Sequence, residues 1–506
     1  MKRLIALILT LITLFSLVAC SSSIAPQDPA TEEKTAETKQ EEAKKTAENP
    51  NEYLVKGTGD ITLPEGFSVG YARVDITPTS WPTLFYNGEY ANSAHDPLQF
   101  TCVALSDGEN VALICSVDMR SMGVTLHEKA KDLLIKSIEK HADFKVSPDN
   151  IFINNSHSHS AVDCGMDDPT VVKWKSQVFY KKLALVGEAA VRDLAPAEAY
   201  SGISHTEGLT FVRRYFREDG AFTSIHYRET SDAPIVRHES DPDTEMRTVR
   251  FDREGDKKDV VMVNYQSHYG SAESIWPDQI SADFVHQMRE NAEKDTDCLF
   301  SYIAGAGGNL VFNTRIAGER KYPTIVEGGA YMWEVAKKAM ASEEKIATGA
   351  IRSAAIQYKG EHNHDYDQET IDKARAISNA QVRSAEQQKL INELGFHSRY
   401  QASDILAGIN ADYTEFPLAA ISCGDLAFCA FPYEMWDTNG KECREASPFK
   451  VTFISSLTNG SVGYIPAAHA FPNGGYEVYS CRFKPGCGEE FVGEMLKLLG
   501  ECKNAA

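Results

Sequence analysis

A short apolar run that ends at two histidines constrains the fold of this chain more than any other feature. Ile151 to Ile153 are apolar, and His157 and His159 follow with one residue between them. Such a run predicts a buried strand, and in an extended backbone alternate side chains point to the same side. Both imidazoles would then face one cavity, where one could hold a metal ion while the other moves protons. The simpler alternative is a polar loop with two unrelated histidines.

Other apolar runs form hairpins or alternate with helical patterns. Asp107-Gly108 separates two runs and indicates a hairpin, and a second hairpin is expected around residues 253–256. This mixture predicts an α/β fold, with a mixed β-sheet core covered by helices. Strands are expected at Phe67–Pro78, Cys102–Leu105, Val111–Asp118, Thr248–Phe251, Val260–Val263, Ala419–Ser422, Leu426–Phe431 and Val451–Ile454, and helices at Leu126–His141, Trp174–Leu194, Thr324–Ser342, Gln368–Leu394 and Glu489–Leu499.

The first residues have the pattern of a bacterial lipoprotein signal. A basic start, Met1-Lys-Arg, precedes the apolar run Leu4 to Val18, and small residues lead to Cys20. Residues 1–19 are therefore expected to be a signal peptide, and Cys20 to carry lipid after cleavage. We predict an exported protein that is anchored to the cell membrane through Cys20. An ordinary secretory signal with a chance cysteine is the alternative.

Residues 20–60 are predicted to be a disordered linker behind the lipid anchor. Their composition is rich in Ser, Ala, Thr, Glu and Lys and contains almost no large apolar side chains. Such a segment cannot bury enough apolar surface to offset its loss of conformational entropy. Residues 61–506 are long enough to form one large α/β core or two fused subdomains, and we expect one catalytic domain.

The overall charge argues against a nucleic-acid partner. The chain has 72 acidic and 51 basic residues, a formal net charge of −21. Nucleic-acid binding depends on Lys and Arg side chains that neutralise phosphates. Of the cysteines beyond Cys20, Cys423 with Cys429 or Cys481 with Cys487 could form disulfides, but we expect mostly reduced, buried thiols.

Three further apolar runs also lead into possible ligands. His268 follows the run at Val260–Val263, Glu434 follows Leu426–Phe431, and Tyr464 follows Val451–Ile454, with Tyr476 twelve residues later. Taken singly, each has an ordinary explanation as a core or surface residue. Together, two histidines, a carboxylate and a phenol would form a plausible zinc shell with room for water, because the ends of neighbouring strands converge.

The order of these segments resembles the neutral/alkaline non-lysosomal ceramidase family, in its N-terminal amidohydrolase domain. The similarity is spread over separate blocks between Gly70 and Tyr479, and the blocks occur in the family's order. They are Gly70-Tyr-Ala-Arg-Val-Asp-Ile-Thr-Pro78, His95-Asp-Pro-Leu98, Ser116-Val-Asp118, Asn155-Ser-His-Ser-His-Ser160, Asn264-Tyr-Gln-Ser-His268, Ile280-Ser-Ala-Asp283, Phe431-Pro-Tyr-Glu434, Asn459-Gly-Ser-Val-Gly-Tyr464 and Gly475-Tyr-Glu477.

The resemblance implies a role for each matching residue. Zn²⁺ would be bound by His157, His268, Glu434 and Tyr464. His159 would be the general acid and base, and Tyr476 would donate to the substrate carbonyl oxygen. The substrate-contacting arginine matches Arg213 best, with Arg214 as the alternative.

The chain departs from the family in places that bear on its substrate. Val212 stands where the family has Asn before the arginine, and Asn309 replaces an Asp in the loop Gly305–Asn309. The run Ser160–Asp163 differs from the family's Ser-Gly-Pro-Gly. The sequence also ends at Ala506, so we expect no C-terminal immunoglobulin-like domain.

The resemblance implies a zinc-dependent amidohydrolase that cleaves an N-acyl amide, as in the conversion of ceramide to a sphingoid base and a fatty acid. Its partners would be a lipid-like or N-acyl amide substrate and the membrane that holds Cys20. One alternative is a zinc hydrolase of another exported amide or ester. The other is a non-catalytic lipoprotein that binds a solute.

Overall fold

The computed structural model describes residues 49–85, 88–225, 231–270, 272–312 and 314–504. The predicted signal peptide, Cys20 and most of the predicted linker lie outside these residues. Pro50–Ala506 form one compact unit. The unit begins before the expected boundary at residue 61, because Tyr53 and Arg73 exchange two backbone hydrogen bonds of 2.9 Å. None of the helices in the described residues has the length and apolar character needed to cross a bilayer.

The larger of the two main sheets is mixed, as predicted, and has nine strands. In order of pairing they are β16 (Leu299–Ala304), β14 (Val260–Tyr265), β13 (Glu245–Arg253), β8 (Ala195–His205), β1 (Ser68–Asp75), β5 (Gln99–Ser106), β6 (Val111–Val117) and β7 (Ile151–Asn155), with β18 (Glu344–Ile346) paired to β8. The two predicted hairpins are confirmed as the antiparallel pairs β5–β6 and β13–β14. The pairs β6–β7 and β14–β16 are parallel.

The smaller main sheet packs face to face against the larger one. Its four strands, in order, are β19 (Ile351–Glu361), β20 (Tyr413–Cys423), β21 (Leu426–Ala430) and β23 (Val451–Ser455). One buried cluster contains Tyr71 and Ile114 of the larger sheet together with Ile421, Phe428 and Phe453 of the smaller sheet. The site is therefore built on two stacked sheets.

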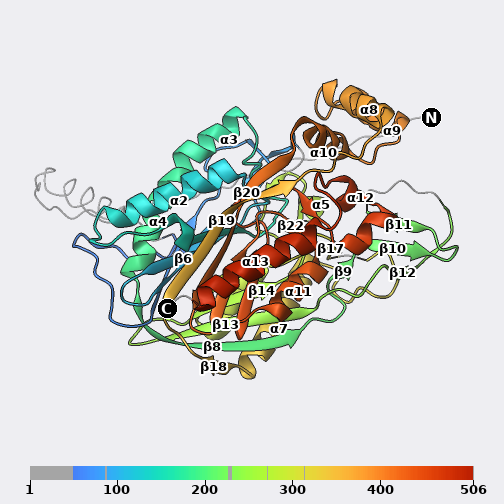
Figure 1. The fold of residues 1–506 in the computed structure, drawn as a ribbon. Coiled ribbons are helices and arrows are strands. Elements are labelled where there is room, and N and C mark those ends of the chain that lie inside the picture. Colours follow the sequence, from blue (N-terminus) through green and yellow to red (C-terminus); the bar gives the residue numbers. More distant parts are fainter. Residues whose placement is uncertain (1–48, 86–87, 226–230, 271, 313, 505–506) are drawn as a thin grey trace, which may run out of the picture. The chain divides into compact units, whose positions relative to one another are not determined.

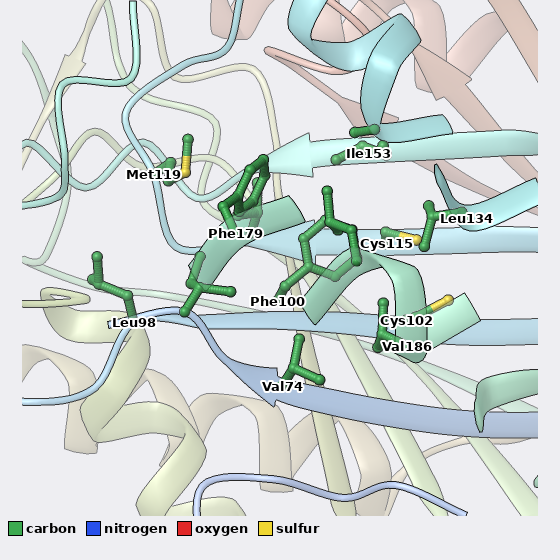
Figure 2. Packing of buried hydrophobic residues seen from close by; sticks show 14 of the residues in the cluster. Val74, Leu98, Phe100, Cys102, Cys115, Met119, Leu134, Ile153, Phe179 and Val186 are labelled. Atoms are coloured by element: carbon green, nitrogen blue, oxygen red, sulfur yellow. The ribbon is translucent and has the colours of Figure 1, made fainter. Parts of the chain in front are cut away.

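Helices cover the outer faces of both sheets. On the larger sheet, α2 (Val124–Glu139) and α4 (Tyr180–Arg192) lie side by side, and Figure 2 shows Phe100, Cys115 and Ile153 of the strands beside Phe179 and Val186. On the smaller sheet, α11 (Asp437–Ala446) lies next to α13 (Cys487–Asn504) (Figure 1). A further pair, α6 (Phe284–Thr296) and α7 (Ile325–Ala341), packs against β13, β14 and β16. These layers confirm the predicted α/β class.

The helical insertion (residues 362–412) lies between β19 and β20 and has a small core of its own. The helical pattern over Gln368–Leu394 is broken into α8 (Gln368–Asn379) and α9 (Ala385–Glu393), followed by α10 (Arg399–Asn410). The break has a local cause: Arg383 adopts a φ of 62°, and the Ser384 side chain caps α9 by accepting from the Gln387 N–H.

Short elements connect these layers and bear several of the site residues. They are β2 (Thr83–Leu84), β3 (Tyr90–Ala91), β4 (Ser93–Ala94), η2 (Pro148–Asn150), α3 (Pro169–Trp174), η3 (Lys175–Phe179), β9 (Phe211–Val212), β10 (Arg214–Arg217), β11 (Phe222–Ser224), β12 (Ile235–His238), α5 (Ala272–Ile275), β15 (Gln279–Ile280), β17 (Leu310–Val311), β22 (Glu434–Met435), β24 (Tyr464–Ile465), η4 (Ala468–Asn473) and α12 (Tyr476–Tyr479).

The cysteines from Cys102 to Cys502 are buried and free. This agrees with the prediction that the thiols would be reduced. Neither Cys423 with Cys429 nor Cys481 with Cys487 forms a disulfide.

Buried asparagines join strand ends from the two sheets. The Oδ1 atom of Asn154 in β7 accepts from the Ala304 N–H in β16 at 2.8 Å, and its Nδ2 donates to the carbonyl of Ser456, just beyond β23, at 2.6 Å. Asn264 in β14 likewise exchanges two hydrogen bonds with the backbone of Ile454 in β23, at 3.0 and 2.9 Å. Because β7, β16 and β23 are edge strands, these amides bring three sheet edges together.

We expect Asn154→Ala to lower the free energy of unfolding by about 3 kcal/mol, because a buried backbone group left without its partner costs about 1–3 kcal/mol. Chemical denaturation followed by circular dichroism measures this change. Asn392→Ala, an exposed asparagine of α9, is the control and should stay within about 0.5 kcal/mol of the parent. A loss below about 1 kcal/mol for Asn154→Ala would contradict its role in joining the edges.

Candidate metal centre

His157 is held just beyond the end of β7. Its backbone N–H donates to the Met119 carbonyl at 3.0 Å, and its φ of 67° lies in the left-handed region. The backbone between His157 and His159 is thus not extended, and the predicted reason for their proximity is wrong. Their Nε2 atoms nevertheless lie 3.4 Å apart. A non-glycine residue with this φ costs of order 1–3 kcal/mol, which the surrounding contacts must outweigh.

His268 follows β14 and is held by the glycine-rich loop 305–309 that follows β16. Its Nδ1–H donates to the carbonyl of Gly307 at 3.2 Å. Residue 308, which follows Gly307 in this loop, must also be glycine. A Cβ atom on Gly308 would lie 2.7 Å from the backbone oxygen of Glu434. This close approach brings the loop, His268 and Glu434 to the same point.

The hydrogen bonds of both rings place the proton of a neutral imidazole on Nδ1 and leave Nε2 for a ligand. The Nδ1–H of His157 donates to the Arg120 carbonyl at 2.9 Å, so its Nε2 carries a lone pair. His268 has the same tautomer, and its Nε2 faces a guanidinium N–H of Arg213 at 3.3 Å. The two Nε2 atoms are 3.3 Å apart. A shared cation would satisfy both lone pairs.

Strand pairing brings Glu434 and Tyr464 together. β22 and β24 are parallel, with Glu434 opposite Tyr464, and the Glu434 N–H donates to the carbonyl of Gly463 at 2.9 Å. The Tyr464 hydroxyl and the Glu434 carboxylate are close enough for each to shift the pKa of the other. Burial opposes ionisation of Glu434, but His157, Tyr464 and Arg213 hold its pKa below the usual value. The carboxylate is therefore charged at neutral pH.

The donor atoms around His157 fit a zinc ion. Its Nε2 lies 3.3 Å from His268 Nε2, 3.3 Å from Glu434 Oε2 and 3.4 Å from His159 Nε2. Ligands about 2.0–2.1 Å from one zinc ion at tetrahedral angles lie about 3.3–3.4 Å apart. Glu434 Oε2 is buried and has no hydrogen-bond partner among the described residues, and it lies 3.3 Å from His157 Nε2. These spacings suit a metal ion, for which the three histidines offer a group of ligand atoms.

His159 lies beside this centre and also lines a cavity of about 660 Å³. Its ring stacks on Tyr269, with centroids 3.5 Å apart and planes 15° apart. The potential ligand atoms of His157, His159 and His268 all lie within 4.8 Å of one another. Burial, together with the neighbouring His157 and Arg120, keeps the pKa of His159 well below its usual value. His159 is therefore a neutral imidazole that could serve either as a third nitrogen ligand or as a base.

Arg213, rather than Arg214, lies at the centre. Arg213 is buried and donates to Glu477 at 2.7 Å, to the Gly308 carbonyl at 2.7 Å and to the Tyr464 hydroxyl at 3.2 Å. Arg214 instead pairs with Glu239 and donates to backbone carbonyls of the segment that contains η4. Arg213 thus lies among the candidate ligands, where it can hold Tyr464 and the glycine-rich loop in position.

Tyr476 and His159 line the same cavity, which has a volume of about 660 Å³. The Tyr476 ring meets that of Tyr464 edge to face, with centroids 5.5 Å apart. Burial and the nearby Glu434 charge raise the pKa of Tyr476, so its hydroxyl keeps its proton and can act as a donor. All seven residues expected from the sequence to form the site, which are His157, His159, Arg213, His268, Glu434, Tyr464 and Tyr476, surround this cavity or the centre behind it.

Two residues that hold this arrangement were not predicted. Arg120 contributes its carbonyl to His157 and lines the cavity, and Glu477 orients Arg213. Arg120 could have been found, because it follows the apolar run Val111–Val117, a parallel neighbour of β7, at the same sheet edge. Glu477 gives no such signal, since it lies in a four-residue helix, α12.

The comparisons with known proteins establish the fold. No protein-family model and no curated protein matches the chain. The crystal structure of neutral ceramidase from Pseudomonas aeruginosa is similar, with a TM-score of 0.64 and 13% sequence identity over 87% of this chain and 74% of that chain. A ceramidase complexed with C2 gives a TM-score of 0.63 and 13% identity over 87% and 76% of the two chains. The chain thus has a fold like that of these ceramidases.

Zinc content tests the candidate centre. We expect purified protein to hold about one zinc ion per chain, and His157→Ala or His268→Ala to lose most of it, because either change removes a nitrogen ligand. Mass spectrometry of metals after dialysis measures the content. The control is His141→Ala, which removes a histidine paired with Glu188 and should retain zinc. Equal zinc in all four proteins would contradict the site.

Proposed function

We propose that the protein is a zinc-dependent amidohydrolase that cleaves an N-acyl amide bond, as ceramidases do. One observation carries the proposal most: the Nε2 atoms of His157 and His268 lie 3.3 Å apart beside the Glu434 carboxylate. These groups come from separate strand ends, and the neighbouring His159 lines a cavity of about 660 Å³. The ceramidase-like fold is a second, independent support.

Each step of the reaction would depend on a different side chain, from His159, Tyr476 or Arg213. A bound zinc ion would polarise the amide carbonyl and lower the pKa of water, so that water could attack the carbonyl as hydroxide. His159 would accept the proton of the attacking water and return it to the departing amine. Tyr476 would donate a hydrogen bond to the carbonyl oxygen as negative charge develops there. Arg213 would hold Tyr464 and add positive charge behind the centre.

We also propose that the protein is exported and held at the membrane by lipid on Cys20. The pattern of basic, apolar and small residues before Cys20 supports this, although it lies outside the described residues. An anchored enzyme would meet substrates at or near the membrane surface.

The second candidate function is hydrolysis of an exported amide or ester other than ceramide. The lining of the cavity favours this second candidate. A neutral lipid with two long chains needs a continuous apolar wall, whereas this cavity is lined mostly by polar side chains. A non-catalytic receptor would explain the lipid anchor, but it gives no reason for neutral imidazoles and a carboxylate to converge.

The direct test is hydrolysis of fluorogenic N-acyl amides, including ceramide, by zinc-loaded protein. We expect cleavage that stops with a chelator and returns when zinc is added. Bound zinc without cleavage of any amide or ester would reject the hydrolase and favour the receptor.

We expect His159→Ala to lower kcat at least about a hundredfold while zinc stays bound, because a positioned acid–base group contributes about 10²–10⁴-fold. Turnover and zinc content should be measured on the same preparation. His205→Ala, which removes an exposed histidine of β8, is the matched control. If zinc and activity vanish together, His159 is a ligand and not the base.

The pH dependence of kcat provides a separate test of His159. A base must be neutral to accept a proton, and the pKa of His159 is held well below its usual value of about 6.5. Lowering the pKa extends the neutral form to lower pH, so kcat should remain on its plateau at about pH 6. An acidic limb with an apparent pKa at or above about 6.5, in protein that retains its zinc, would contradict this assignment.

A further inference from the structure

The cavity in front of the candidate metal centre has an unusual wall. The helical insertion supplies much of it, through one face of α9 that contains Ser384, Gln387, Gln388 and Ile391. Counted from the N-cap Ser384, these are positions i, i+3, i+4 and i+7, which lie on the same side of a helix. Among the described residues that line the cavity, Ile391 alone has an aliphatic side chain. The wall thus offers hydrogen bonds rather than an apolar groove.

Three arginines reach this cavity from different parts of the chain. Arg120 comes from the strand end beside His157, Arg383 from the break between α8 and α9, and Arg399 from the start of α10. The chain as a whole has a net charge of −21, so three guanidinium groups around one cavity run against its overall charge. Of the described residues in the wall, Glu89 is the one carboxylate.

The arginines are only partly neutralised by the protein. Arg120 and Arg383 approach the two oxygens of Asp163 at 3.8 and 3.7 Å, which is too long for hydrogen bonds. Within the described part of the chain, Arg399 has no carboxylate within ion-pair distance. It lies over the Tyr400 ring, 4.3 Å from the centroid, and one of its Nη2–H groups donates to the Tyr400 hydroxyl at 2.6 Å. Donors therefore remain for a ligand.

Two helices also direct their N-termini to this cavity. Ser384 and Ser398, the N-caps of α9 and α10, both line it. The N-terminal end of a helix macrodipole is positive, so both helices add to the attraction for an anion. Cations at the first turn of a helix are unfavourable, yet Arg399 is the first residue of α10.

We propose that the substrate is a polar amide that carries an anionic group, a carboxylate or a phosphate, held by Arg120, Arg383 and Arg399. This inference rests on the proposed hydrolase function, because His159 and Tyr476 line the same cavity. Guanidinium groups bind carboxylate and phosphate through paired hydrogen bonds, which would fix the amide relative to the centre. A neutral long-chain ceramide would leave the arginines without partners.

Matched substrates test the proposal in the zinc-loaded full chain. N-Hexanoylglycine is compared with neutral N-hexanoylglycinamide, and the phosphate ester of N-hexanoylethanolamine with the free alcohol. We expect kcat/KM to be at least about tenfold higher for the anion of one pair or both, and the larger ratio identifies the anion. Equal values within both pairs, or faster cleavage of a short-chain ceramide than of either anion, would overturn the proposal.

Substitutions locate the anion site. Arg383→Gln and Arg399→Gln should each lower the ratio of anionic to neutral kcat/KM about tenfold, because each removes a charge-assisted hydrogen bond. A ratio is insensitive to loss of folded protein. Lys389→Gln removes an exposed cation of α9 outside the cavity and should leave the ratio unchanged. A ratio unaffected by both arginine substitutions would overturn the assignment.

Binding separates failure of this inference from failure of the hydrolase. The probes are ketone isosteres of N-hexanoylglycine and its amide, in which a methylene replaces the amide nitrogen, so that they bind without being cleaved. Calorimetry should show at least about tenfold tighter binding of the acid, weakened by salt and by Arg399→Gln. If this holds but no amide is cleaved, the hydrolase fails and the anion site stands. If amides are cleaved but both isosteres bind equally, the anion site fails.

Discussion

Buried asparagine amides bring distant parts of the chain to one point. Asn154 and Asn264 exchange hydrogen bonds with the backbone of strands that are remote in sequence, and they join edges of the two stacked sheets. His157 and His268 follow these same strands, and the glycine-rich loop follows β16. The candidate metal centre is thus a consequence of how strand ends are joined. Because an amide offers a donor and an acceptor together, one side chain can satisfy the backbone of two strands.

The electrostatics of the centre follow from this placement. Nδ1 of His157 donates to the Arg120 carbonyl, and Nδ1 of His268 donates to the Gly307 carbonyl. In the neutral rings, both Nε2 atoms are then left for a cation. Glu434 adds negative charge, and Arg213 balances it from behind while holding Tyr464. Buried groups of this kind are unfavourable without a partner. The cavity outside has the opposite character, with three arginines, so the same polypeptide would attract a cation at the centre and an anion at the entrance.

The sequence predicted the parts of this account that depend on local patterns. Apolar runs ending in His157, His268, Glu434 and Tyr464 identified the strand ends, and Asp107-Gly108 identified a hairpin. What it did not predict depends on contacts between distant residues. The left-handed backbone of His157 and the position of Glu477 behind Arg213 are set by tertiary packing. Nor does any periodicity show that residues of the helical insertion line the cavity in front of the centre.

Anomalous diffraction at the zinc absorption edge, recorded from crystals of the purified protein, tests the central claim most directly. The account predicts one zinc peak within about 2.0–2.3 Å of Nε2 of His157, Nε2 of His268 and an oxygen of Glu434. A peak elsewhere in the molecule, or its absence from zinc-loaded crystals, would contradict the claim that these strand ends form a metal centre.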